Sequence, residues 1–239
     1  GGKMKRILNR LTIIVVVIVG SIMYANTQKE NRNIGEAVQV TSLPISGKVI
    51  VLDAGHGTPD EGAQSSKGTT EAESNLAITL KVQKLLEQSG AHVVLTRSDE
   101  KSIYDLDSKT LKQKKISDIH NRVKIGNSAS ADIFVSIHLN KIPQQEYTGW
   151  QCFYNSKNEH SKKLAEMIQE NLNQAIQKEN ERIAMKLDKV YIMKHVEIPI
   201  SIVECGFLSN PQEEQELLQD SYQERLAWGI YNGIISYFE

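Results

Sequence analysis

The chain has 239 residues, 40% of them hydrophobic, and a formal net charge of −1. This length supports one sizeable core and not clearly two, and the near-zero charge gives no electrostatic case for binding nucleic acid. The two cysteines, Cys152 and Cys205, are too few for a disulfide scaffold or a set of zinc fingers. They could form one bridge, but buried thiols are the favoured interpretation because free cysteine usually behaves as a small core residue.

The N-terminal segment, residues 1–25, contains a basic flank followed by the apolar run from Leu11 to Ala25. This order directs export, with the basic end kept in the cytoplasm. The run has 15 residues, whereas a full membrane span needs about 20, so it fits a signal-peptide core or a short anchor. Met23 occupies a place where signal peptidase sites have a small residue. An uncleaved apolar helix that anchors the chain to the membrane is therefore favoured.

Residues 26–44 are polar and without a strong period, which predicts a linker. Residues 45–239 then form one extracytoplasmic domain, membrane-anchored or secreted. Its short apolar runs indicate strands and its stripes of period 3.6 indicate helices. In chain order we predict a strand at 48–53, a helix at 72–90, a strand at 91–97, a helix at 116–131, strands at 132–138 and 149–155, a helix at 159–177, a strand at 200–206 and a helix at 223–238.

This alternation predicts an α/β fold: a single twisted sheet, mostly parallel or mixed, with helices on both faces. The stretch from Ser98 to Lys115 is charged and irregular. It is interpreted as a solvated surface, with contact to an anionic polymer as the alternative.

Three chemically capable residues stand at the ends of three predicted strands. His56 follows the first strand, His138 closes the strand at 132–138, and Glu204 ends the apolar part of the strand at 200–206. In α/β sheets, ligands bind at the carboxyl ends of the strands. The sequence therefore predicts a site at this edge.

A phosphate-binding loop and a metal site are the two interpretations of Gly55-His56-Gly57. A dinucleotide fingerprint needs a third glycine where Asp60 stands, and a helix that begins there. The next predicted helix begins only after Thr70, and no Gly-Lys-Ser/Thr follows. A phosphate-binding loop is therefore disfavoured.

The metal interpretation uses His56, His138 and Glu71, because catalytic zinc often takes two histidines and one glutamate and keeps one position for water. The flanking glycines let the backbone turn sharply, so that the His56 imidazole can enter the cleft. Asp53 and Asn140 are candidates for hydrogen bonds behind the ligands. Alternatively, Asp53 only caps the turn.

Glu204 is the candidate catalytic carboxylate, because one carboxylate can remove a proton from water and then protonate a leaving amine. The alternative is a capping or ion-paired glutamate, although a carboxylate is costly to bury without a function. The rival chemistry is Cys205 as a nucleophile. Adjacent strand residues point to opposite faces, so Cys205 should face away from the cleft if Glu204 faces into it.

Six motifs together resemble a known family, the zinc-dependent N-acetylmuramoyl-L-alanine amidases of the amidase-3 type. They cover the chain from Lys48 to its end and read "VLDAGHG", "GTTEAESNLAI", "VVLTR", "NRVKIGN", "ADIFVSIHLN" and "IVECGFLSNPQEEQEL". The resemblance implies that His56, Glu71 and His138 bind one zinc ion and that Glu204 is catalytic. It also implies the bond that is cut, the amide between the lactyl group of N-acetylmuramic acid and L-alanine in peptidoglycan.

The stretches "SLPISGKVIVLDAGHG" and "SIHLNKIPQQEYTGWQCFY" are most similar to the spore-cortex, or germination-specific, branch of this family. That resemblance implies work in the forespore intermembrane space or cortex. There, removal of the stem peptide prepares muramic acid for δ-lactam formation, with a deacetylase acting next. A partner protein that activates the enzyme or completes its zinc site is a further hypothesis. The alternatives are another zinc peptidoglycan hydrolase, such as a peptidase or deacetylase, and a non-catalytic wall-binding module.

Overall fold

The computed structural model describes residues 2, 4, 18–24 and 43–239. Residues 18–24, the part of the predicted apolar helix within these ranges, are helical. The rest of the run from Leu11 to Ala25, and residues 26–42 of the predicted linker, lie outside the described residues. Within those ranges, none of the helices combines the length and the apolar character that crossing a bilayer requires.

Residues 43–239 are built around one six-stranded sheet with the spatial order β2-β1-β3-β6-β4-β5. The strands are β1 (Val49–Ala54), β2 (His92–Leu95), β3 (Ile133–Asn140), β4 (Gln151–Tyr154), β5 (Met185–Lys186) and β6 (Ile200–Phe207). The strands β2, β1, β3 and β6 run parallel, and β4 is antiparallel to β6. The predicted α/β sheet is therefore confirmed, in its mixed form.

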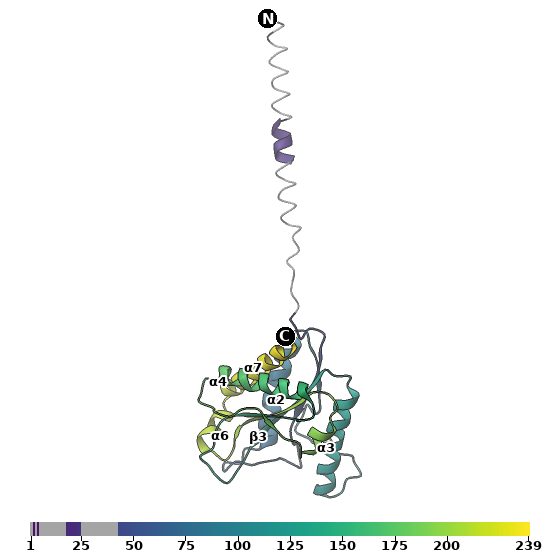
Figure 1. Cartoon of the computed structure of the whole chain (residues 1–239), viewed down its shortest axis with the longest axis vertical. Helices are drawn as coiled ribbons and strands as arrows, with labels where there is room; N and C mark the ends of the chain where they lie inside the picture. Colours follow the sequence, from purple (N-terminus) through teal and green to yellow (C-terminus); the bar gives the residue numbers. More distant parts are fainter. Residues whose placement is uncertain (1, 3, 5–17, 25–42) are drawn as a thin grey trace. The chain divides into compact units, whose positions relative to one another are not determined.

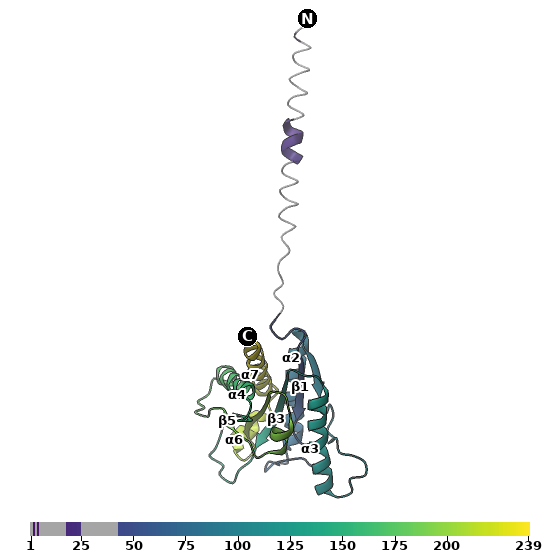
Figure 2. The same ribbon diagram turned by 45° about the vertical axis from the view of Figure 1, so that its right-hand side comes forward.

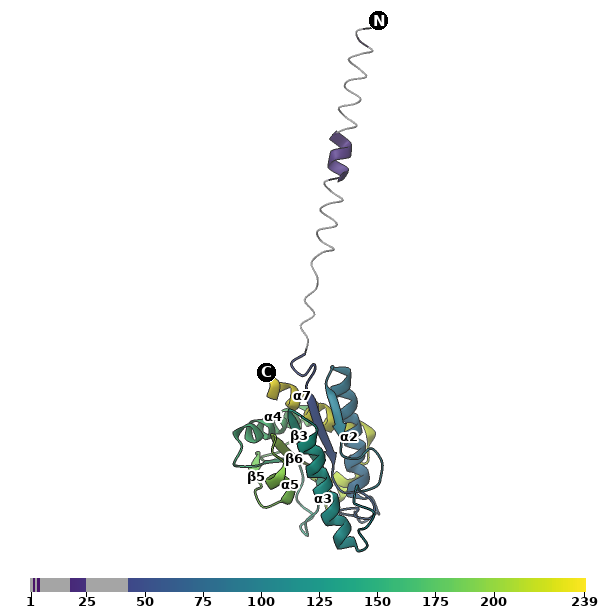
Figure 3. The ribbon, with the colours of Figure 1, turned by 90° about the vertical axis from the view of Figure 1, so that its right-hand side faces the viewer.

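Helices cover both faces of the sheet, as predicted (Figures 1 and 2). They are α2 (Glu71–Gln88), α3 (Leu111–Ser128), α4 (Glu159–Ile176), α5 (Tyr191–His195), α6 (Pro211–Leu217) and α7 (Asp220–Phe238). One hydrophobic cluster joins the sheet to α2, α4 and α7, and a second joins its other face to α3 and α5. Figure 3 shows these helices around the strands.

The alternation of side chains along β1 explains this layering. Ile50 and Leu52 are buried in the cluster that contains α2, whereas Val51 is buried in the cluster that contains α3. Successive side chains of a strand point to opposite faces, so a continuous apolar run is suited to a strand that is covered twice. Because both faces of β1 are covered by apolar side chains, polar side chains can reach solvent or a ligand only at the ends of the strand.

Three short elements were not predicted: β5, α5 and α6. In addition, α3 begins at Leu111, so the last five residues of the stretch predicted to be irregular are helical. Thr110 and Gln113 form a capping box there, in which each side chain accepts a hydrogen bond from the other's backbone N–H. The Thr-x-x-Gln spacing is a signal of a helix start, and it outweighs the run of charges that suggested a surface loop.

Candidate metal centre

A tight turn after β1 presents His56. The backbone of His56 is left-handed, with φ of 62°, and Gly57 and Asp60 then exchange backbone hydrogen bonds of 2.9 and 2.8 Å. A Cβ atom on Gly55 would overlap the imidazole of His138. Gly55 therefore does more than allow the turn, because its missing side chain leaves the space that His138 occupies.

Glu71 is the first residue of α2 and is buried. Its Oε2 accepts a hydrogen bond of 2.9 Å from the backbone N–H of Ala63, within the loop that follows His56. Its Oε1 accepts one of 3.2 Å from the backbone N–H of Leu139 on β3. Both oxygens are thus oriented by backbone donors, which fixes the carboxylate between the loop and the sheet.

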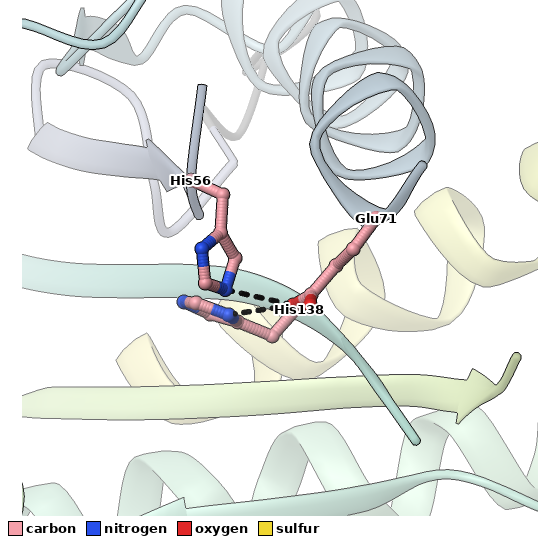
Figure 4. Close-up of side chains that lie close together, drawn as sticks. All are labelled: His56, Glu71 and His138. Atoms are coloured by element: carbon pink, nitrogen blue, oxygen red, sulfur yellow. Dashed lines mark hydrogen bonds and ion pairs between the residues drawn. The ribbon is translucent and has the colours of Figure 1, made fainter. Parts of the chain in front are cut away.

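The structure brings His56, Glu71 and His138 together, as Figure 4 shows. The Oε1 atom of Glu71 lies 3.3 Å from Nε2 of His56 and 3.0 Å from Nδ1 of His138. One ligand atom of each residue lies within 4.8 Å of those of the other two. Two imidazoles and one carboxylate are a donor set that zinc takes in catalytic sites, so these residues fit a metal ion by chemistry and by spacing.

The imidazoles and carboxylates of the centre stabilise one another's charged forms. Burial disfavours the charged imidazole, but hydrogen bonds to Asp60 and Glu71 outweigh it and raise the pKa of His56 to about 9. Burial likewise opposes ionisation of Glu71, yet His138 and His56 hold the pKa of Glu71 well below its usual range. The carboxylate is therefore ionised near neutral pH, the state in which it can bind a cation.

Glu204 faces the same space. It lies on β6 directly opposite His138 of β3 in the parallel register, and it lines a pocket of about 220 Å³ together with His56 and His138. Its Oε2 is buried without a hydrogen-bond partner among the described residues. Burial, with a smaller contribution from Glu71, raises the pKa of Glu204. A carboxyl group that holds its proton more tightly than usual is suited to exchange it with a reactant.

The cysteine alternative fails on position and charge. Cys205 is fully buried in the hydrophobic cluster under α2, α4 and α7, on the opposite side of β6 from Glu204. Burial and the neighbouring Glu204 raise the pKa of the Cys205 thiol, which disfavours the nucleophilic thiolate. Cys152 is also a buried free thiol, so the expectation of two buried thiols is confirmed.

The two residues expected behind the ligands lie near the site with other partners. Asp53 is buried and accepts hydrogen bonds of 2.6 Å from the hydroxyl groups of Thr96 and Ser136 and one of 2.5 Å from Arg122. The carbonyl oxygen of Asn140 accepts a hydrogen bond of 2.8 Å from the backbone of Leu208. Neither side chain has an imidazole among its hydrogen-bond partners in the described part of the chain.

Asp60 contacts His56 instead, and the sequence reasoning did not single it out. Its Oδ2 lies 3.4 Å from Nδ1 of His56, the ring nitrogen opposite the one that faces Glu71. Its Oδ1 lies 2.8 Å from Nζ of Lys115 on α3. A carboxylate on the outer nitrogen of a ligating histidine fixes the tautomer and orients the ring. No pattern in "HGTPD" predicts this contact, because it depends on the tight turn between the two residues.

Two buried arginines support the turn that carries His56, and they too were missed. Arg122 of α3 donates hydrogen bonds of 2.6 Å to the carbonyl oxygen of His56 and 2.7 Å to that of Ala54. Arg97 donates one of 3.0 Å to the carbonyl oxygen of Gly55. The sequence offered one signal: Arg97 follows an apolar strand and Arg122 lies within an amphipathic helix. A charged side chain that is buried at such a position needs hydrogen-bond partners.

The remaining histidines do not line this pocket; they are His92, His120, His160 and His195. A larger surface groove of about 830 Å³ runs between α2 and α7, but its lining includes none of the donor residues and not Glu204. The smaller pocket is thus where the chemically capable groups converge.

Comparison with known proteins shows three similarities. A family model described as N-acetylmuramoyl-L-alanine amidase matches residues 50–236. The chain is 39% identical over 197 residues to the germination-specific N-acetylmuramoyl-L-alanine amidase of Bacillus subtilis, covering 82% of each chain. Its fold resembles the CwlD amidase from Clostridioides difficile, solved in complex with the GerS lipoprotein, with a TM-score of 0.78, 44% identity and coverage of 80% and 98% of the two chains.

Proposed function

The chain belongs to the N-acetylmuramoyl-L-alanine amidase family, and on that premise we propose that it hydrolyses the amide between the lactyl group of N-acetylmuramic acid and L-alanine in peptidoglycan. One observation carries the proposal. Glu204, a buried carboxyl group with a raised pKa, opens into the same pocket as the His56–Glu71–His138 donor set. A metal site beside a proton-transfer group is the combination that metal-assisted amide hydrolysis uses.

His56, Glu71 and His138 would hold one zinc ion. Zinc bound there would supply a Lewis acid for the scissile carbonyl and lower the pKa of the attacking water. The chain's own contribution is to hold the ligands in place. Backbone donors from Ala63 and Leu139 fix the Glu71 carboxylate. Arg122 fixes the backbone of His56.

Glu204 would move the proton. As the water oxygen bonds to the carbonyl carbon, the Glu204 carboxylate accepts the proton that the water releases. When the carbon–nitrogen bond breaks, the protonated Glu204 delivers that proton to the alanine nitrogen. Burial raises the pKa of Glu204, which lets one group act first as base and then as acid.

Digestion of purified peptidoglycan with and without a zinc chelator tests the reaction. We expect peptides with free L-alanine amino termini together with peptide-free muramic acid, and we expect the chelator to stop their release. Cuts within the stem peptide, or loss of acetyl groups, would show another zinc hydrolase in place of an amidase. A protein that binds the wall without turnover would show a binding module.

We further propose that the chain acts outside the cytoplasm in spore cortex maturation, because its Bacillus subtilis relative is named germination-specific. In the forespore intermembrane space or cortex, removal of the stem peptide would free muramic acid for δ-lactam formation. Residues 1–25 would serve as export signal or anchor, residues 26–44 as linker and residues 45–239 as catalytic domain. Spores that lack the protein should contain cortex muropeptides without muramic δ-lactam; unchanged δ-lactam content would refute this role.

A partner protein is the last part of the proposal. The Clostridioides difficile CwlD amidase was solved with a lipoprotein, GerS. We propose that a comparable lipoprotein orders or completes the zinc site of this chain. Zinc content and amidase activity should rise when the purified chain is mixed with its native lipoprotein neighbour, and an unchanged zinc content would argue against the partner.

A further inference from the structure

One face of α3 forms a wall of the pocket. Lys115, Asp118, Ile119 and Arg122 all line it, and their spacing of three, four and seven residues places them on one side of a helix. This wall faces His56 and Glu204, which belong to the donor set and the proton-transfer group. It is therefore a surface that a substrate bound at the centre would touch.

Two residues of the described pocket lining carry a fixed positive charge, Arg122 and Lys115. Arg122 is buried and its guanidinium is occupied by Asp53, Asp118 and backbone carbonyl oxygens. Lys115 differs, because its side chain is 49% exposed and Asp60 is its ion-pair partner within the described ranges. An ammonium group has three N–H donors, so donors remain for a ligand at the pocket mouth.

We propose that Lys115 forms a subsite for a carboxylate on the second residue of the substrate's stem peptide; this rests on the proposed amidase function. The scissile amide precedes L-alanine, and two residues of extended chain span roughly 7 Å. Lys115 lies one carboxylate, that of Asp60, away from His56, which is a comparable reach. In peptidoglycan the second residue is D-glutamate, whose α-carboxylate would meet the ammonium group.

The acidic residues of the lining should make the Lys115 ammonium group selective for its ligand. Asp60, Asp118 and Glu204 also line the pocket, so they would repel an anionic peptide that lacked a positive contact. A hydrogen bond from a charged donor to a carboxylate is stronger than one to a neutral carboxamide. Lys115 should therefore distinguish an α-carboxylate from an amidated α-carboxyl group at the second residue.

Two forms of soluble glycan fragment test the proposal, identical except that the α-carboxyl group of D-glutamate is free in one and amidated in the other. The wild-type protein should prefer the free acid by roughly tenfold in kcat/KM, mostly through KM. Lys115→Ala should abolish the preference, so that both forms are cleaved with the same kcat/KM, and Lys115→Arg should keep most of it. Lys112→Ala, which removes the same charge from an exposed position of α3 outside the pocket lining, should behave like wild type.

The possible results distinguish a failure of the Lys115 subsite from a failure of the proposed amidase function. Equal cleavage of both forms by the wild type, or an undiminished preference in Lys115→Ala, overturns the subsite and leaves the amidase function standing. Cleavage of neither form by the wild type overturns the amidase function and the subsite with it. A preference lost equally in Lys112→Ala shows a general charge effect and also overturns the subsite.

Discussion

At the scale of single residues, the centre depends on carboxylates with different tasks. Glu71 is held by backbone donors and approached by both imidazoles, and Asp60 lies on the outer nitrogen of His56. One oxygen of Glu204 has no hydrogen-bond partner in the described part of the chain. Their pKa values move apart accordingly, downward for Asp60 and Glu71 and upward for Glu204. Such a separation is typical of sites in which one carboxylate binds and another transfers protons.

Replacing Glu204 with Gln should remove catalysis and spare the metal. The amide keeps the size of the side chain but cannot take a proton, so kcat should fall by about 10²–10⁴-fold. Zinc content, measured on the same preparation, should equal that of the wild type. Cleavage at the wild-type rate would show that Glu204 is not the proton-transfer group.

Asp60→Asn should weaken zinc binding. The substitution removes the charge that contacts Nδ1 of His56, and loss of such an outer partner typically costs about 10–100-fold in metal affinity. Competition with a coloured chelator measures the change. Asp118→Asn is a useful comparison, because Asp118 is bonded to Arg122 and not to a ligand; if both variants lose the same affinity, the effect is one of general charge.

Zinc affinity should also depend on pH in a defined window. The pKa of His56 is raised from 6.5 to about 9, so in the metal-free protein this imidazole is protonated at neutral pH and must lose its proton to bind. Apparent affinity should rise by about tenfold per pH unit up to pH 9 and then level off. The stabilisation that the charged imidazole gives the metal-free fold is complete below pH 6.5 and is lost as pH rises through 9. A flat affinity profile between pH 6.5 and 9 would contradict this assignment.

A site residue could be predicted from the sequence where a strand end determines its position, and not where a turn does. His56, His138 and Glu204 could be located because each stands at the end of an apolar run, and parallel strands bring such ends to one edge. Asp60 could not, since its contact with His56 depends on a left-handed backbone and a tight turn. For the same reason Asp53, which is adjacent in sequence to the turn, could be mistaken for the partner.

At the scale of elements, long periodic segments were predictable and short ones were not. The stripe of α4, with Leu164, Ile168 and Leu172 all fully buried, repeats often enough to stand above chance. The two-residue β5 and the five-residue α5 have no room for a period. Their conformation is imposed by neighbours: β5 by its pairing with β4 and α5 by its packing against α3.

The contact between α7 and α4 offers a stability test. A Cβ atom on Gly233 would overlap the backbone of Ile168 on α4. Gly233→Ala should gain about 1 kcal/mol of helix propensity but lose more because the backbone of α4 must move, with a net loss of about 1–3 kcal/mol. The midpoint of urea unfolding measures this.

The exposed position Glu224 of α7 supplies the control, because Glu224→Ala should change the free energy of unfolding by less than about 0.5 kcal/mol. A Gly233→Ala protein as stable as the wild type would show that the two helices can separate at little cost.

At the scale of the whole molecule, the centre links elements that are distant in sequence. His56 follows β1, Glu71 begins α2 and His138 lies on β3, so an ion held by all three would bind the folded chain and not the unfolded one. At a zinc concentration of 100 times Kd, the free energy of unfolding should rise by about 2.7 kcal/mol. For a domain of this size the melting temperature should rise by roughly 5–10 °C.

Two variants separate binding from catalysis in that measurement. His138→Ala removes a donor and should lose the thermal shift, whereas Glu204→Gln should keep it. A shift of equal size in His138→Ala would show that zinc stabilises the protein at another place.

Arg122 gives these proposals a common consequence. It shares its face of α3 with Lys115, and its guanidinium holds the carbonyl oxygen of His56. A peptide bound at Lys115 would stabilise α3, whose Arg122 holds the backbone of the proposed zinc ligand His56. Thermodynamic linkage is reciprocal: the factor by which bound peptide changes the affinity for zinc equals the factor by which zinc changes the affinity for peptide. Bound substrate would then raise the affinity for zinc, and bound zinc would raise the affinity for substrate. The protein would therefore retain its metal best while peptidoglycan is bound.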